Sequence, residues 1–113
     1  MANPLRSEVW LADLGTTRGH EQAGRRPVLI FSVDAFNSGP AGLVIVLPFT
    51  STIRNVPAHI LVRPPEAGLR RPSAVLCDAI RSVTKDCMIN RWGTVSAAPM
   101  ASVVGTVRFL LGL

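Results

Sequence analysis

The sequence has no tyrosine, one lysine, two cysteines and no long hydrophobic run among its 113 residues. Its longest uninterrupted apolar stretch, residues 43–47, is far shorter than the roughly 18 residues that a membrane-spanning helix needs. No charged N-terminal region followed by an apolar segment opens the chain, so we expect no secretory signal. The sequence therefore predicts a cytoplasmic protein that has no membrane partner.

The two cysteines, Cys77 and Cys87, have no second pair with which to build a zinc site. Without a secretion signal, two free thiols in a reducing compartment are favoured over a disulfide. No group of histidine, cysteine and acidic residues has the spacing of metal ligands. We therefore expect no metal and no other cofactor.

Basic residues exceed acidic residues, and almost all of them are arginine. Eleven of the twelve cations are arginine, against seven acidic residues, and the net charge is +5. The planar guanidinium group matches phosphate oxygens in a way that the lysine ammonium does not. A basic balance indicates a nucleic acid or an acidic protein as partner, without choosing between them.

The length and the 48% hydrophobic content predict one domain over residues 1–113 with a single modest core. Apolar and β-branched runs predict several short strands, separated by segments rich in glycine, proline and polar residues. The expected strands are residues 8–14, 27–33, 43–47, 59–62, 74–77, 80–84 and 93–95, the pair 74–77 and 80–84 also being compatible with one strand kinked near Asp78. The expected irregular segments are residues 15–26, 34–42, 50–57 and 64–72.

The C-terminal segment has a different periodicity, that of one helical face. Ser96 is placed to cap this helix at its start and Gly112 to end it. The architecture expected is mainly β, a small and strongly bent sheet or barrel closed by one helix. The residues expected on the apolar helical face are Met100, Val103, Val104, Val107, Leu110 and Leu111.

The segment 19–27 carries more functional groups than any other. It holds an imidazole, a carboxylate, an amide and two guanidinium groups, from His20, Glu21, Gln22, Arg25 and Arg26. One interpretation is a solvated connector; the other is a binding or catalytic loop on a rigid scaffold. The following proline restricts Arg26 to extended backbone, which gives its side chain a defined direction.

This segment, Gly19-His20-Glu21-Gln22-Ala23-Gly24 followed by Arg26-Pro27, resembles the signature loop of the MazF/PemK (Kid) toxins. Weaker matches follow in order along nearly the whole chain, and the ordered set makes a chance resemblance unexpected. They are Glu8-Val9-Trp10-Leu11 with Asp13-Leu14, Pro27-Val28-Leu29-Ile30, Pro48-Phe49-Thr50-Ser51, Cys77-Asp78 with Ile80-Arg81-Ser82, and Gly93-Thr94-Val95.

The resemblance implies a CcdB/PemK-like fold, a bent antiparallel sheet of the SH3 type with a C-terminal helix. It implies a homodimer with single-stranded RNA in a groove near the dimer interface. It also implies a toxin whose metal-independent, sequence-specific endoribonuclease activity (mRNA interferase) leaves a 2′,3′-cyclic phosphate and a 5′-hydroxyl. An acidic antitoxin protein that covers the groove would neutralise such a toxin.

The resemblance also assigns roles to residues, position by position. Three positions depart from the family pattern: Ala79 stands where glutamine is common, Leu76 where one branch has arginine, and Ser7 where glycine is usual. The catalytic candidates are Arg26, Thr50, His20, Glu21 and Asp78, and the RNA-binding candidates are Gln22, Arg25, Ser51 and Phe49.

Cleavage by the 2′-hydroxyl needs a base, a cation to stabilise the phosphorane, and an acid for the departing oxygen. Arg26 suits the cation role because a guanidinium stays protonated, which makes it a poor base. Thr50 can donate a hydrogen bond to the same oxygens. The base is left open between His20, whose ordinary pKa suits proton transfer near neutrality, and Asp78 or Glu21.

Other interpretations stand beside these. Asp78 can bind backbone groups at a strand kink, and His59 can have a structural role. Phe49 can belong to the core or stack on a base, and Trp92 can lie at a dimer interface or on the RNA-binding surface. A same-fold, non-enzymatic gyrase inhibitor of the CcdB type should lack the set Arg26, Thr50 and Asp78. Another alternative is a catalytically weakened family member that binds RNA or antitoxin without cutting RNA, and Ala79 is the one residue that indicates it.

Overall fold

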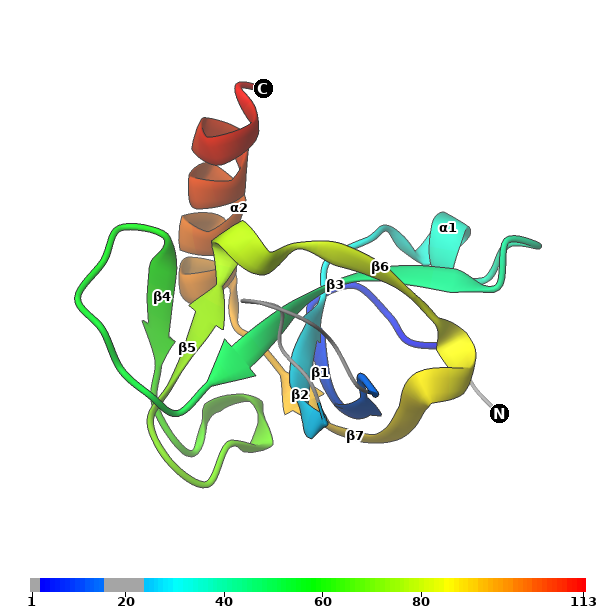
Figure 1. The fold of residues 1–113 in the computed structure, drawn as a ribbon, viewed down its shortest axis with the longest axis horizontal. Coiled ribbons are helices and arrows are strands. Elements are labelled where there is room, and N and C mark those ends of the chain that lie inside the picture. Colours follow the sequence, from blue (N-terminus) through cyan, green and yellow to red (C-terminus); the bar gives the residue numbers. More distant parts are fainter. Residues whose placement is uncertain (1–2, 16–23) are drawn as a thin grey trace.

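The computed structural model describes residues 3–15 and 24–113, whose chain forms a bent antiparallel sheet with a helix at its C-terminal end (Figure 1). Seven strands occur in these residues, together with two α-helices and three short 3₁₀ turns. In chain order they are β1 Glu8–Asp13, β2 Arg25–Ile30, α1 Asp34–Asn37, β3 Leu43–Thr50, β4 His59–Val62, η1 Glu66–Gly68, β5 Ser73–Leu76, η2 Cys77–Ala79, β6 Arg81–Thr84, η3 Lys85–Cys87, β7 Met88–Thr94 and α2 Ala97–Leu111.

The sheet has the strand order β4-β5-β3-β2-β1-β7, and β6 pairs with β3 outside this path. The eight-residue strand β3 is shared: its first half pairs with β6, its last two residues pair with β5, and β2 lies along its other edge. Because one strand changes partner along its length, the sheet bends around it (Figure 1). The expected mainly β architecture with one C-terminal helix is confirmed.

The core has two clusters, one on each face of the central strands. Successive residues of a strand point to opposite faces, so Leu29 and Leu47 join the cluster beneath α2, whereas Val28 and Val46 join the other cluster. All four are fully buried. Burying such a side chain stabilises the fold by about 1.5–3 kcal/mol. Burial on both faces explains why residues 28–30 of β2 and 43–49 of β3 are continuously apolar rather than alternating.

Several strand ends differ from the sequence-based expectation. β2 ends at Ile30 instead of residue 33, because the amides of Phe31 and Ser32 both donate to the carbonyl of Ile45 and the chain then turns into α1. α1 replaces the expected irregular segment, and the buried side chain of Asn37 holds it by donating to the carbonyls of Pro4 and Ser32. β3 continues to residue 50, and β7 begins at residue 88, because β1 pairs along most of its length.

α2 ends where expected but its apolar face is shorter than expected. Gly112 adopts a left-handed conformation (φ 71°) that ends the helix. Val103 and Val107 are buried, whereas Leu110 and Leu111 are 43% and 53% exposed because the last turn projects beyond the sheet (Figure 1). The inclusion of these two leucines in the packed face was therefore wrong. Among the residues that the structure describes, no helix is long and apolar enough to cross a membrane.

Ser96 occupies the N-cap position of α2, but its side chain does not cap the helix. Its hydroxyl instead donates to the carboxylate of Glu66 at 2.6 Å. This hydrogen bond ties the start of α2 to η1, the turn that lies against β7. The expected position of the cap is thus confirmed, and its expected hydrogen bond is not formed.

Candidate active site

A cavity of about 360 Å³ opens where β2 begins and β3 ends. Its lining combines four arginines with hydroxyl groups and apolar side chains, and none of the described lining residues is acidic. The lining residues are Arg25, Arg26, Pro27, Phe49, Thr50, Ser51, Leu69, Arg70, Arg71, Ser73 and Trp92. A volume of this size is in the range of ligand sites, and the charge favours an anion.

Strand register brings Arg26 and Thr50 to the same cavity. Val28 pairs with Pro48 across antiparallel β2 and β3, and the same register continued by two residues places Arg26 opposite Thr50. The half-buried Arg26 donates from Nη1 to the carbonyl oxygen of Phe49 at 3.1 Å. The hydroxyl oxygen of Thr50 accepts a hydrogen bond from the amide of Thr52 at 3.1 Å. The guanidinium and hydroxyl that the motif indicated therefore line one site.

The remaining RNA-binding candidates that the structure describes are placed differently from one another. Arg25 and Ser51 are exposed and line the cavity. Phe49 also lines the cavity, but its side chain is 1% exposed and belongs to the core cluster beneath α2. Its ring offers no free face for a nucleobase, so of the two interpretations of Phe49 the structure supports the core one. His20, Glu21 and Gln22 lie outside the described residues.

Asp78 does not line the cavity with Arg26. Ser73 at the start of β5 lines the cavity, and Asp78 follows the opposite end of that strand, in η2. There its carboxylate oxygen lies 3.9 Å from Nε2 of His59, the two side chains being 57% and 12% exposed. Within one chain, the structure thus separates Asp78 from the other described catalytic candidates.

The imidazole of His59 and the thiol of Cys77 are embedded near the strand kink. Nδ1 of His59 is buried and has no hydrogen-bond partner among the described residues. Burial and, to a smaller extent, the neighbouring Asp78 carboxylate together raise the pKa of the Cys77 thiol to about 11. A thiol with that pKa stays protonated near neutrality and is a poor nucleophile. Cys77 and Cys87 are both free, and Cys77 has a packing role.

Three lining residues carry chemistry that the sequence did not assign to the site: Arg70, Arg71 and Ser73. Trp92, for which the sequence leaves a dimer surface or an RNA surface open, also lines the cavity. The one available signal was the adjacent pair of arginines inside a proline-rich segment, since irregular segments on a scaffold often carry binding groups. Residues 3–15 and 24–113 contain no group of three potential metal ligands.

Comparison with known proteins identifies relatives along almost the whole chain. Residues 5–111 match the family model described as PemK-like, MazF-like toxin of type II toxin-antitoxin system. Endoribonuclease MazF9 of Mycobacterium tuberculosis is 31% identical over 113 residues, with 96% of each chain covered. Endoribonuclease MazF of Staphylococcus saprophyticus is 32% identical over 110 residues, covering 96% of this chain and 91% of the relative.

Solved structures agree with the sequence relatives. The crystal structure of MazF from Deinococcus radiodurans superposes with a TM-score of 0.87 at 30% identity and covers 100% of both chains. A mycobacterial endoribonuclease in complex with its cognate antitoxin gives a TM-score of 0.80 at 30% identity, covering 97% of this chain and 96% of that one. The chain therefore belongs to the family of PemK-like and MazF-like toxins of type II toxin-antitoxin systems and is a homologue of the MazF endoribonucleases.

Proposed function

We propose that this protein cleaves single-stranded RNA by attack of the 2′-hydroxyl on the adjacent phosphate, without a metal ion, leaving a 2′,3′-cyclic phosphate and a 5′-hydroxyl. The observation that carries the proposal is the cavity in which Arg26 and Thr50 meet, because its described lining is cationic and contains no carboxylate. Such a site attracts a phosphodiester and stabilises negative charge that develops on it.

The two residues supply different parts of the reaction. As the 2′-oxygen bonds to phosphorus, charge accumulates on the two non-bridging oxygens, which a guanidinium can hold bidentately. A guanidinium carries five N–H donors, and Nη1 of Arg26 donates to the carbonyl of Phe49 at the edge of the cavity. The hydroxyl of Thr50 accepts from the amide of Thr52, so its proton remains available as a donor.

The base has to come from beyond the described lining of the cavity. The side chains there are guanidinium, hydroxyl, indole or hydrocarbon groups, none of which accepts a proton readily near neutral pH. His20 is our first candidate because the ordinary pKa of imidazole lies near neutrality, and Glu21 is the second. Asp78 ranks third because its carboxylate faces His59 instead of the cavity.

The alternatives make different demands on this cavity. A gyrase inhibitor of the same fold requires no phosphate-binding arginine beside a hydroxyl, so the pairing of Arg26 with Thr50 favours the nuclease. A member that binds RNA without cutting it would keep the cations but give no new RNA ends. Mapping the ends of an incubated RNA separates these two possibilities.

Incubation of the purified protein with a long RNA in excess EDTA is expected to give cleavage at a short sequence motif. The products should carry 2′,3′-cyclic phosphate and 5′-hydroxyl ends. A 5′-hydroxyl end is recognised because polynucleotide kinase labels it without prior phosphatase treatment, whereas a 5′-phosphate end requires that treatment. The same RNA with 2′-O-methyl at the cleaved nucleotide should stay intact because the attacking hydroxyl is blocked. Strict dependence on added magnesium, or cleavage of the methylated RNA, would contradict the proposed chemistry.

We further propose that the protein works in the cytoplasm as a homodimer and that an acidic antitoxin covers its RNA groove. A dimer carries twice the +5 charge of one chain, which favours a partner rich in carboxylates. Light scattering at micromolar concentration should give twice the 12.1 kDa of the chain. Association with the antitoxin should slow as salt rises, because screening weakens steering. A monomer with full activity, or an association rate independent of salt, would count against this assembly.

A further inference from the structure

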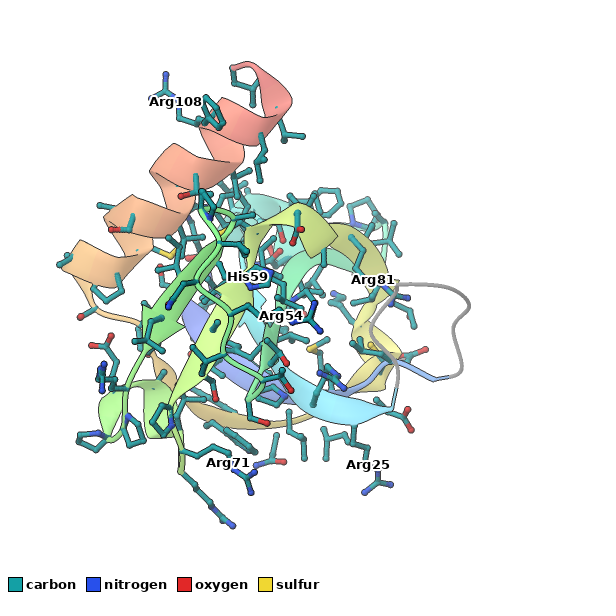
Figure 2. The ribbon with its side chains drawn as sticks, turned by 60° about the vertical axis from the view of Figure 1, so that its left-hand side comes forward. Arg25, Arg54, His59, Arg71, Arg81 and Arg108 are labelled. Atoms are coloured by element: carbon teal, nitrogen blue, oxygen red, sulfur yellow. The ribbon has the colours of Figure 1, made fainter. Side chains whose placement is uncertain are left out.

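We infer that Arg70 and Arg71 form a second phosphate-binding subsite, which holds a phosphate of the RNA next to the scissile one. The inference rests on the proposed function, in which Arg26 binds the scissile phosphate. All three arginines line the same cavity, Arg26 from β2 and the other two from the segment between η1 and β5. Figure 2 shows Arg71 and Arg25 on the same side of the molecule, away from Arg108 near the end of α2.

The backbone that carries the two arginines is fixed from both ends. Before them, the side chain of Leu69 is 5% exposed in the core and its amide donates to the carbonyl of Glu66 at 3.1 Å. After them, the hydroxyl of Ser73, a residue only 4% exposed, donates to the carbonyl of Arg71 at 3.1 Å. Short anchored segments lose little entropy when their side chains bind a ligand. Arg70 and Arg71 are thus exposed side chains on a fixed support.

Two glycines place this support against the wall of the cavity. A Cβ on Gly68 would lie 2.3 Å from the carbonyl oxygen of Trp92, and a Cβ on Gly93 would lie 2.6 Å from the carbonyl carbon of Ala67. The backbones of η1 and β7 therefore touch at a distance that side chains would prevent. This contact sets Leu69, and the arginines after it, beside Trp92 at the cavity rather than in solvent away from it.

The guanidinium groups of Arg70 and Arg71 have no hydrogen bond or ion pair with another residue of the described chain, whereas Arg91 pairs with Glu8 at 2.7 Å. Two adjacent exposed cations repel each other, and no described acidic side chain lines the cavity to offset them. A phosphodiester supplies that offset, and guanidinium is well matched to it. A second phosphate of the same strand is the anion that the proposed reaction brings to this place.

The test uses the full-length protein and three variants, R70A, R71A and R70A/R71A, on an RNA that the wild type cleaves. The matched control is R63A/R108A, which removes the same charge from two exposed residues that do not line the cavity. Each subsite substitution should raise KM about tenfold and leave kcat unchanged, because binding outside the reacting group contributes equally in ground and transition states. The slope of log binding constant against log salt should fall by about 0.7 per arginine.

RNAs with a neutral methylphosphonate at one linkage at a time locate the contact. At one position beside the cleaved bond, the neutral linkage should weaken RNA binding by the wild type as much as the R70A/R71A substitution weakens binding of the unmodified RNA. The same neutral linkage should not weaken RNA binding by R70A/R71A any further. Equal losses of RNA affinity in R70A/R71A and R63A/R108A would overturn the subsite. So would a neutral linkage whose effect adds to that of R70A/R71A at every position in the RNA. Binding of the same oligonucleotides, followed by fluorescence anisotropy, is independent of cleavage. A wild type that binds with this pattern but never cuts would refute the proposed function and retain the subsite.

Discussion

Replacement of Arg26 by alanine should lower the rate of RNA cleavage by about 10²-fold or more while the protein remains folded. Loss of one preorganised donor to a developing oxyanion typically has an effect of this size. The guanidinium of Arg26 is half-buried in a cavity whose described lining has no carboxylate, so its interaction with phosphate is less screened than that of an exposed cation. Single-turnover cleavage at saturating enzyme measures the effect on the chemical step.

Three further variants test whether the loss of cleavage in Arg26→Ala is specific to the guanidinium group at this position. Arg26 also donates to the carbonyl of Phe49, so Arg26→Lys retains the charge but not the planar fork and should recover only part of the activity. Arg25→Ala removes an exposed lining cation and should be milder, and Arg108→Ala should match the wild type. Thermal unfolding of each variant shows whether the fold survives. A fully active Arg26→Ala enzyme would remove this residue from the mechanism.

Replacement of Gly68 by alanine should destabilise the protein by about 3 kcal/mol or more, one of the largest effects expected of a methyl group. The backbone at Gly68 has a φ of 71°, which is strained for any residue with a side chain, and the added Cβ would lie 2.3 Å from a carbonyl oxygen that belongs to β7. A backbone atom cannot rotate away as a flexible side chain can. Denaturant unfolding followed by fluorescence measures the change.

Gly42→Ala is the matched control for this substitution. Gly42 has a φ of 70° but no atom within 4 Å of an added Cβ, so it tests the conformational strain without the collision. A left-handed conformation costs roughly 1–2 kcal/mol for a residue with a side chain. If the two glycine variants lost the same stability, the collision of the added Cβ with β7 would not contribute to the destabilisation of Gly68→Ala.

The sequence predicted the strands and the helix because their patterns are local. A run such as residues 43–47 is apolar enough to be recognised without knowing its neighbours. The ends were less predictable because they depend on pairing. β7 reaches back to Met88 through an antiparallel partner, β1, that lies far away in the sequence. Likewise, Leu110 continues a helical period, and the period does not reveal that the sheet stops before the last turn of α2.

The site residues also fall into those that local sequence identifies and those whose position depends on long-range packing. Arg26 and Thr50 were identified by motif, and register explains why they meet. Arg70 and Arg71 could not be placed from sequence, because their position depends on the close backbone contact at Gly68 and Gly93, which are 25 residues apart in the sequence. Asp78 follows a matching motif, yet the kink at η2 turns its carboxylate toward His59. Sequence motifs identify the candidate residues, and long-range packing determines which of these residues line the same cavity.

The cavity draws its walls from distant parts of the chain, and this has a consequence for how the protein is made. Its lining begins at Arg25 on β2 and is completed only by Trp92 on β7, which is also the strand that pairs with β1. Synthesis proceeds from the N-terminus, so a ribosome must have passed residue 92 before the cavity can close. A product that ends before Met88 lacks β7 entirely and leaves one edge of β1 without its partner. Translation that stops before residue 92 therefore releases a fragment in which the described lining of the cavity is incomplete.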